Sequence, residues 1–277
     1  MTICAFIFAP DIVKTVPIFI LNITFLRGFF NLYVLSGVPQ GWSLTAEECF
    51  YFSAPFIFFL LKSIRLFIQP IFITLIGISL VSIFSRHYIY GFFENYTFMF
   101  GYTFFGRSLE FYIGIYLALR VKKLSRVEKK GFLLSLLGVL SIIFCILLAL
   151  LTKKESDYND DIHNPFEIAI LLYLLPFAIG ILFYGLLREK TYLSKLLGSG
   201  LFELLGKSSF VFYMIHVGFI TIFLKKVFPI ATPWGFISIF VCLNIISIIL
   251  FKYVESPLNK LIRGLSKKNR RWAFQRA

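Results

Sequence analysis

Three groups of ionisable and hydroxyl side chains interrupt otherwise apolar sequence, and they are the first candidates for chemistry. The first group is the string GWSLTAEECFY at residues 41–51. Glu47 and Tyr51 are four residues apart and therefore share one face of a helix. Ser43 or Thr45 is suited to cap the start of that helix, where the helix dipole favours the two adjacent carboxylates. The alternative interpretation is an ordinary capped helix start with a tryptophan as an interfacial anchor.

The second group is the string GRSLEF at residues 106–111. Arg107 and Glu110 are three residues apart on one helix face, where they can form an ion pair. Pairing lowers the cost of placing either charge in a membrane, and ionisable residues within apolar spans are functional candidates for that reason. The alternative is a pair that only fixes the packing of the helix.

The third group is a polar stripe along an apolar helix that ends in the string LGKSSFVFYMIH at residues 205–216. Its members recur at helical spacing, which places them on one side of the helix. Such a stripe is expected to face the bundle interior or a water-filled cavity, although a single histidine in a membrane is most often a packing residue. The stripe consists of Glu203, Gly206, Ser209, Tyr213 and His216.

The elements that must hold these groups are predicted to be transmembrane helices. Hydrophobic residues make up 58% of the 277 positions and charged residues only 15%, whereas a soluble domain has nearer half and a quarter. The mean hydropathy is +0.84. The apolar runs lack the alternation of a membrane β-barrel.

A spanning helix needs about 20 mostly apolar residues. Seven stretches meet or nearly meet this requirement, and an eighth, at residues 12–30, either spans or lies bent at the interface because it contains Lys14, Pro17, Asn22 and Arg27. The expected fold is an all-α, polytopic helical bundle of seven to eight spans that forms one domain over residues 1–277. The seven stretches are residues 44–61, 66–84, 104–119, 131–151, 166–187, 204–224 and 234–251.

The net charge of +14 is concentrated between and beyond the apolar stretches. Residues 120–130, 188–200 and the tail 252–277 are basic, whereas residues 152–165 are acidic. This alternation predicts a multi-pass protein of the plasma (inner) membrane whose basic tail, residues 252–277, is cytoplasmic. Only the loop at residues 225–233 departs from the pattern. Basic loops near anionic lipid, rather than a nucleic-acid groove, explain the charge, so membrane lipids are the expected partners.

The four cysteines share no metal-ligand spacing, and each lies in or beside apolar sequence. We therefore interpret them as reduced packing residues, and we predict neither a metal site nor a disulfide framework.

The three groups together resemble the acyltransferase-3 family of integral membrane O-acyltransferases. Residues 42–55 match its W-S-L-x-x-E-x-x-F-Y-x-x-x-P signature at every fixed position, and the second group is similar to its R-x-x-E-F-x-x-G element. The third group is similar to L-G-x-x-S-Y-x-x-Y-x-x-H, with Phe210 in place of the first tyrosine, and residues 253–257 are similar to Y-x-x-E-x-P.

This resemblance implies transfer of an acyl group from acyl-CoA to a hydroxyl of a cell-surface glycan or glycolipid. The acyl group expected from the family is acetyl. It implies no bound cofactor, with acyl-CoA as the donor substrate. Glu47, Arg107, Glu110 and His216 are then supporting residues of the reaction. Residues expected to bind substrate are Trp42, Ser43, Tyr51, Ser209 and Tyr213. We further expect Glu47 and Arg107 to approach each other, or to meet through water, and Glu48 to be the more exposed carboxylate.

The family's N-terminal helices, with the histidine thought to be its catalytic base, have no counterpart in this sequence. The string LYVLSG at residues 32–37 echoes a family motif, but it stands only four residues before Trp42, whereas the family separates the two widely. Two other functions remain open. A glycan or lipid transporter would show inverted repeats and broken helices, and a non-catalytic remnant or subunit would only support a partner.

Overall fold

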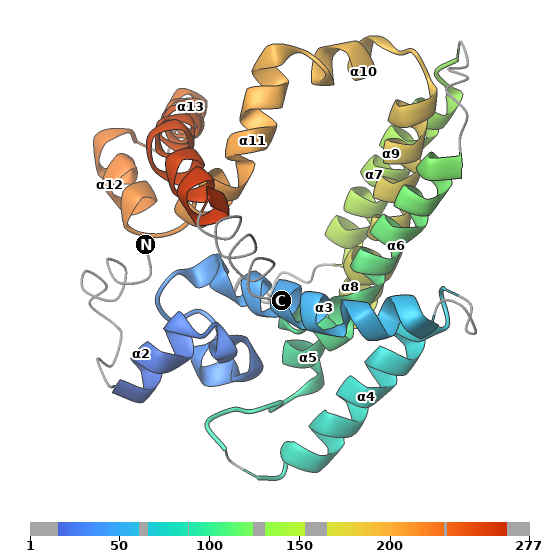
Figure 1. The fold of residues 1–277 in the computed structure, drawn as a ribbon, viewed down its shortest axis with the longest axis vertical. Coiled ribbons are helices and arrows are strands. Elements are labelled where there is room, and N and C mark those ends of the chain that lie inside the picture. The colour runs from blue at the N-terminus through green and yellow to red at the C-terminus, as the bar shows by residue number, and fades with distance from the viewer. Residues whose placement is uncertain are drawn as a thin grey trace, which may run out of the picture. The chain divides into compact units, whose positions relative to one another are not determined.

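The computed structural model describes residues 16–60, 66–87, 89–123, 131–152, 165–229 and 232–264. These residues are almost entirely helical, as predicted, and they contain no strand beyond one isolated bridge between Phe30 and Phe92. They form two compact units, which we call the large unit (residues 16–196) and the small unit (residues 197–264). Figure 1 labels the helices of both.

The large unit begins with a short helix, α2 (Val16–Ile23), rather than with a span. Phe25 adopts a left-handed backbone conformation (φ 56°), and three short 3₁₀ turns, at Leu26–Phe29, Asn31–Tyr33 and Pro39–Gly41, follow before the next helix. Of the two alternatives for the eighth stretch, the continuous span is therefore wrong over the described part, residues 16–30, and the segment is bent. The physical reason is that Asn22 and Arg27 are buried in hydrogen bonds with this turn segment instead of facing lipid.

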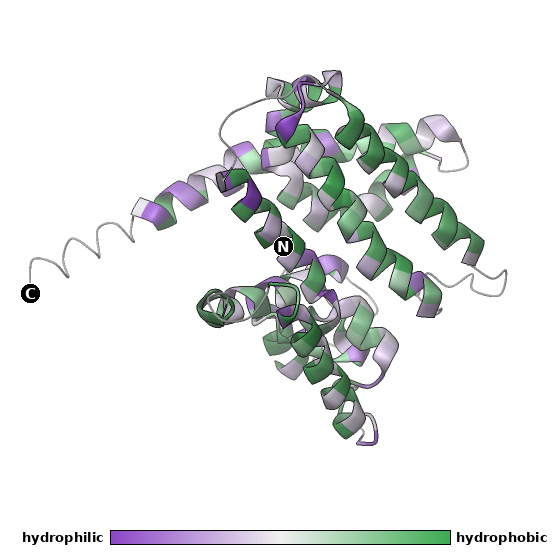
Figure 2. Ribbon diagram, turned by 90° about the vertical axis from the view of Figure 1, so that its right-hand side faces the viewer, coloured by the Kyte–Doolittle hydropathy of each residue, from purple (hydrophilic) through white to green (hydrophobic). Residues whose placement is uncertain are grey.

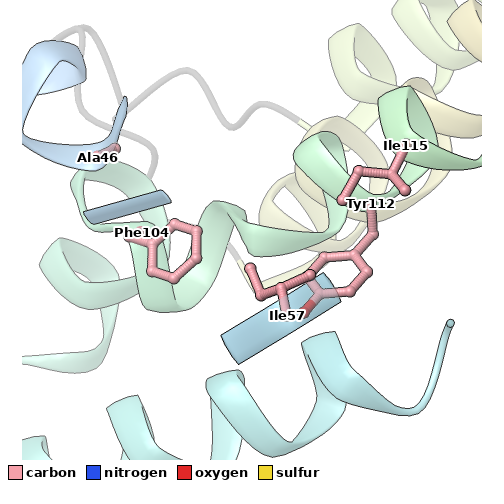
Figure 3. Close-up of a cluster of buried hydrophobic side chains, with 5 residues drawn as sticks. All are labelled: Ala46, Ile57, Phe104, Tyr112 and Ile115. Carbon is pink, nitrogen blue, oxygen red and sulfur yellow. The ribbon is translucent and has the colours of Figure 1, made fainter. Parts of the chain in front are cut away.

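Four helices follow, and the first three pack against the fourth, α6. They are α3 (Trp42–Leu60), α4 (Gln69–Phe84), α5 (Tyr96–Tyr102) and α6 (Phe104–Lys123). Figure 3 shows the buried cluster between α3 and α6, in which Ala46 and Ile57 meet Phe104, Tyr112 and Ile115. The Tyr112 hydroxyl donates a hydrogen bond of 2.7 Å to Gln69 Oε1 on α4, so the one polar group of this core is paired.

A hairpin of two long helices completes the large unit. The first is α7 (Leu133–Thr152), and the second runs from Pro165 to Arg188 through α8 (Pro165–Ile168), a π-helical segment (Ala169–Leu174) and α9 (Leu175–Arg188). Small residues let the two backbones touch: a side chain on Gly138 would meet Leu182 N at 2.6 Å, and one on Gly185 would meet Ser135 N at 2.5 Å. Close approach through small residues is a common way for membrane helices to pack. The short helix α10 (Tyr192–Leu197) follows.

The small unit holds α11 (Gly200–Ile215), α12 (Phe219–Val227) and α13 (Pro233–Leu250), which continues through a π-helical segment (Phe251–Glu255) to Gly264. The predicted span at residues 204–224 is not one continuous helix, because α11 and α12 are bent by 90° at a break. Gly218 lies in this break with φ 127°, a backbone conformation that residues with a side chain rarely adopt.

Fewer helices than predicted are long and apolar enough to cross a membrane. The described residues contain three: α7, the helix Pro165–Arg188 and the helix Pro233–Gly264, with a fourth if α11 and α12 together make one broken span. Helix α4 has 16 residues, or about 24 Å, against roughly 30 Å of hydrocarbon. Helices α3 and α6 contain charged residues near their starts. Figure 2 shows apolar residues along most of each helix, as expected for an integral membrane protein.

Candidate functional site

The first two sequence groups meet in the large unit at the starts of α3 and α6. Arg107 donates from Nε to Glu110 Oε1 at 2.9 Å, and its Nη2 lies 2.8 Å from the same oxygen. The guanidinium carbon lies 5.1 Å from the centre of the Trp42 ring, within the range of a cation–π contact. Arg107 and Glu110 expose 27% and 33% of their side chains. Trp42, Arg107 and Glu110 therefore form one half-buried cluster, which we call the Trp–Arg–Glu cluster.

A second contact joins the same two sequence groups farther along both helices. Phe50 of α3 stacks on Phe111 of α6, with ring centres 4.6 Å apart and planes at 18°. Trp42 also packs edge-on against Tyr102 of α5, at 5.2 Å. The ring of Trp42 is thus held between α5 and the guanidinium, and the relative position of α3 and α6 is fixed at two levels.

Gly106 lets α5 and α6 approach each other beside the cluster. A side chain at this position would meet the carbonyl oxygen of Phe100 at 2.5 Å. The turn between the helices is held by Thr103, whose buried hydroxyl donates to the carbonyl of Met99 at 2.6 Å. This explains a glycine immediately before Arg107: a larger residue would push α6 away from α5.

A buried arginine supports the segment that leads into Trp42. Arg27 exposes only 2% of its surface and donates to Asn22 Oδ1 at 2.8 Å and to the carbonyl of Val38. Its guanidinium occupies the space that a side chain on Gly41 would need. Burial lowers the pKa of Arg27 to about 10. In the sequence, Arg27 and Asn22 indicate only that a span is disfavoured, and this supporting role was not predicted.

The hydroxyls of the first group do not cap α3 as predicted. Ser43 donates to the carbonyl of Gln40 at 3.1 Å, and Thr45 donates to the carbonyl of Phe25. Both hydroxyls therefore point back to the preceding turns instead of accepting from backbone N–H groups. Thr45 also lies against Gly28, where a side chain on the glycine would clash with it. The hydroxyl side chains at the start of α3 thus tie this helix to the turn segment before it.

The predicted direct pair between Glu47 and Arg107 does not form. Arg107 is paired with Glu110 one turn along its own helix, which satisfies its charge locally. Glu47 and Glu48 are both half-buried, and Tyr51 exposes 67% of its surface on α3. The contacts that do link the two groups are those of Trp42 with Arg107 and of Phe50 with Phe111.

The polar stripe of the third group lies in the small unit, on the side of α11 that does not pack on α13. The side toward α13 carries the buried residues Ser208 and Ile215. In the stripe, Glu203 forms an exposed ion pair with Lys207 at 2.5 Å, and Ser209 donates to the carbonyl of Gly206 at 2.8 Å. The stripe is thus a face of one helix, separate from the packed core of its unit.

His216 ends α11 at the break. Its Nδ1 lies 2.7 Å from the carbonyl oxygen of Tyr213. A carbonyl can only accept, so Nδ1 carries the proton and Nε2 is the basic nitrogen of the neutral ring. Phe212 stacks parallel to the imidazole, and Thr221 of α12 donates to the His216 carbonyl at 2.7 Å. The bend therefore presents an oriented imidazole.

A buried carboxylate at the end of α9 was not predicted at all. Glu189 accepts hydrogen bonds from the backbone N–H groups of Leu134 (2.8 Å) and Ser135 (2.9 Å) and from the Ser135 hydroxyl (2.7 Å). It thus caps the N-terminus of α7 from just beyond the C-terminus of α9. The capped residues are 54 and 55 positions away in sequence. Only its position in a basic loop marks it in the sequence. The described residues contain no group of three His, Cys, Asp or Glu side chains that could hold a metal ion.

Comparison with known proteins identifies the family to which this chain belongs. A family model described as an acyltransferase domain, that of acyltransferase-3, matches residues 1–252. The chain belongs to the acyltransferase-3 family. No curated protein and no solved structure matches it. In this acyltransferase-3 protein the match includes the Trp–Arg–Glu cluster and the stripe on α11, whereas residues 253–257 lie beyond it. Acyltransferase activity and an integral membrane location follow from the family and the apolar helices.

Proposed function

We propose that this protein transfers an acyl group, acetyl in the simplest case, from acyl-CoA to a hydroxyl of a cell-surface glycan or glycolipid. The observation that carries the proposal is the Trp–Arg–Glu cluster, because it joins two family motifs that are 65 residues apart in sequence around one cation. A packing pair alone would not require the tryptophan of one motif on the arginine of the other. The proposed location is the plasma membrane, with acyl-CoA arriving at the cytoplasmic side.

The reaction joins the acceptor oxygen to the thioester carbon and breaks the carbon–sulfur bond. The acceptor proton passes to a base, and CoA leaves as its thiol. Negative charge develops on the thioester oxygen, and a preorganised cation stabilises such charge. We assign this role, or the binding of a CoA phosphate, to Arg107. The Glu110 carboxylate accepts from Nε and Nη2 of the Arg107 guanidinium. The remaining N–H groups of Arg107 point away from that carboxylate.

Glu110 and Trp42 act as positioning residues in this scheme. Glu110 fixes the plane of the guanidinium, and Trp42 covers one of its faces. His216 remains a supporting candidate for proton transfer, because its Nε2 is basic in the neutral ring. Ser209 and Tyr213 on the same helix are proposed to contact the acceptor, and Ser43 and Tyr51 to bind substrate near α3. The half-buried Glu47 is a further supporting candidate.

The test uses cells from which the gene has been deleted and to which the full chain or a variant is returned. Acyl esters released by mild alkali from surface glycans and glycolipids are measured by mass spectrometry. The full chain should restore an ester that the deletion lacks, and Arg107→Lys should lower it roughly 100-fold. Lysine keeps the charge but loses the planar contacts to Glu110 and Trp42. Arg120→Lys, near the end of the same helix, is the control. Identical ester content in the deleted and complemented cells would refute the proposal.

One observation favours a second candidate, a glycan or lipid transporter. The 90° break between α11 and α12 is a discontinuous helix of the kind that lines transport pathways. The two candidates differ in covalent chemistry. Membrane vesicles given acyl-CoA carrying an isotope label should incorporate the label into glycan ester if the protein is an acyltransferase. Movement of unmodified glycan across the membrane, with no label incorporated, would favour the transporter.

A further inference from the structure

The large unit contains a cavity of about 470 Å³ between α4, α6 and the helix Pro165–Arg188. This volume lies within the range of small-molecule pockets, roughly 300–1,000 Å³. The cavity is separate from the Trp–Arg–Glu cluster, although Leu109 of α6 forms part of its wall. Its wall is formed mainly by Phe67, Ile71, Thr74, Leu75, Leu109 and Phe177.

The wall has two polar side chains, Thr74 and Tyr173. The Thr74 hydroxyl is already paired, since it donates to the carbonyl of Phe105 at 3.0 Å. The rest of the wall is aliphatic or aromatic. A sugar or a nucleotide entering this cavity would lose its hydrogen bonds to water and gain few in return, which costs several kcal/mol. A hydrocarbon chain has no such groups to satisfy.

The helix that supplies Tyr173 is altered at this point. Tyr173 lies in the π-helical segment Ala169–Leu174, which interrupts an otherwise regular helix. A π-helical turn contains an extra residue, and such turns are found frequently at functional sites. Here the segment brings a tyrosine into the cavity wall and against Phe100 of α5, with ring centres 6.4 Å apart. Local departure from regular helix therefore coincides with the cavity.

A cation lies one aromatic residue away from the cavity. The ring of Phe67, in the wall, is 5.6 Å from that of Tyr116. Arg120 donates from Nε to the Tyr116 hydroxyl at 2.9 Å, and its guanidinium carbon is 5.1 Å from the ring centre. Arg120 is exposed, and it begins the basic run at residues 120–130. The apolar cavity and the guanidinium together match an amphiphile with a hydrocarbon chain and an anionic head group.

We propose that this cavity holds one hydrocarbon chain of an anionic phospholipid, whose phosphate contacts Arg120. The lipid belongs to the leaflet at the basic end of α6. Anionic lipid is the partner that a basic segment beside a membrane attracts, and a hydrocarbon chain is the natural filling of an apolar crevice in a bilayer. The site is independent of the proposed acyl transfer, since it uses neither Arg107 nor Glu110.

The test measures lipid bound to the purified full chain by native mass spectrometry. The protein is stripped of lipid in detergent and titrated with phosphatidylglycerol or with phosphatidylcholine of the same chains. The parent should bind phosphatidylglycerol about fivefold more tightly, as expected for one cation at the head group. Arg120→Gln should remove this preference and leave binding of both lipids. Arg86→Gln, beyond the opposite end of α4, is the control and should keep the preference.

Filling the cavity tests the position of the chain. Leu109→Trp should weaken binding of both lipids about tenfold or more, because the indole occupies the chain's volume. If that variant does not fold, Ile71→Trp at the exposed rim serves instead, with Leu140→Trp on the surface of α7 as the control. Unchanged lipid binding in the folded cavity variant would overturn the proposal. It would also be overturned if palmitoyl-CoA, but neither phospholipid, were lost from the cavity variant, since the occupant would then be a donor chain.

Discussion

Replacing Glu189 by glutamine removes the charge that joins the two ends of the α7–α9 hairpin. The carboxylate exposes only 7% of its surface and accepts three hydrogen bonds from Leu134 and Ser135. Glutamine has one acceptor oxygen, and its other terminal atom is a donor. One of the three donors at the start of α7 therefore loses its acceptor, and the other two face a neutral oxygen.

The expected loss of stability follows from these contacts. A hydrogen bond to a charged group contributes about 1.5–3 kcal/mol, and one between neutral groups about 0.5–1.5 kcal/mol. Losing one charged bond of about 2 kcal/mol and weakening two others by about 1 kcal/mol each gives about 4 kcal/mol. The Ser135 hydroxyl cannot recover this loss, because it gives up its own bond to the oxygen when it turns to accept from the new amide. We therefore expect Glu189→Gln to lower the free energy of unfolding by about 4 kcal/mol.

Thermal unfolding of the purified chain in detergent measures this loss. The thiol of Cys145 on α7 is 2% exposed, so a thiol-reactive fluorescent dye reports when the hairpin opens. At about 2–4 °C per kcal/mol, the midpoint should fall by about 8–16 °C. Glu167→Gln, a half-buried carboxylate at the other end of the same helix, is the control and should unfold close to the parent. Equal midpoints for Glu189→Gln and the parent would refute the capping role.

The same carboxylate predicts a dependence on pH. Burial alone would raise the pKa of Glu189, but hydrogen bonds from the Ser135 hydroxyl and from the Ser135 and Leu134 backbone outweigh it and lower the pKa. A depressed pKa stabilises the fold above the unfolded value of about 4.3, and this stabilisation is lost as the pH falls through the folded value. The parent's midpoint should therefore approach that of Glu189→Gln in acid and exceed it near neutral pH.

Three further substitutions test the packing. Gly138→Leu should separate α7 from α9, because Leu182 N would lie 2.6 Å from the new side chain, and the unfolding midpoint should fall well below the parent's. Gly218→Val should strain the break between α11 and α12, where φ is 127°, whereas Gly206→Val has open space; equal midpoints for these two would contradict the role of the glycine. Arg27→Met should release the turn segment before α3 and change the tryptophan fluorescence spectrum, and an unchanged spectrum at matched folding would contradict it.

Local spacing predicted the contacts that lie within one helix. The Arg107–Glu110 pair follows from a separation of three residues, and the apolar stretches locate most helices to within a few residues. Helical periodicity fixes such neighbours whatever surrounds the helix. The approach of Glu47 to Arg107 was predicted instead from their similar level in the membrane. No direct ion pair joins these two side chains, because Glu110 already pairs with the arginine within one turn.

Contacts between distant segments could not be predicted in this way. Nothing near Glu189 in the sequence points to Ser135, and the two meet only because the glycines of α7 and α9 allow those backbones to touch. The break at Gly218 was hidden for a related reason. Its surroundings are apolar enough for a continuous span, and the bend depends on one glycine φ and on the hydroxyl of Thr221. Hydropathy therefore overestimates the number of spanning helices in regions where the helices are short, charged or bent.

The Trp–Arg–Glu cluster shows why arginine, rather than lysine, is suited to the start of α6. A single planar group must donate to Glu110 through two nitrogens while its guanidinium carbon lies over the Trp42 ring, 5.1 Å from the ring centre. An ammonium can meet one of these demands but has neither a flat face nor a fixed fork of donors. The stacking of Phe50 on Phe111 holds α3 and α6 at the separation that both contacts need. The aromatic residues of the two motifs thus set the geometry, and the guanidinium supplies the fixed cation that the proposed acyl transfer uses.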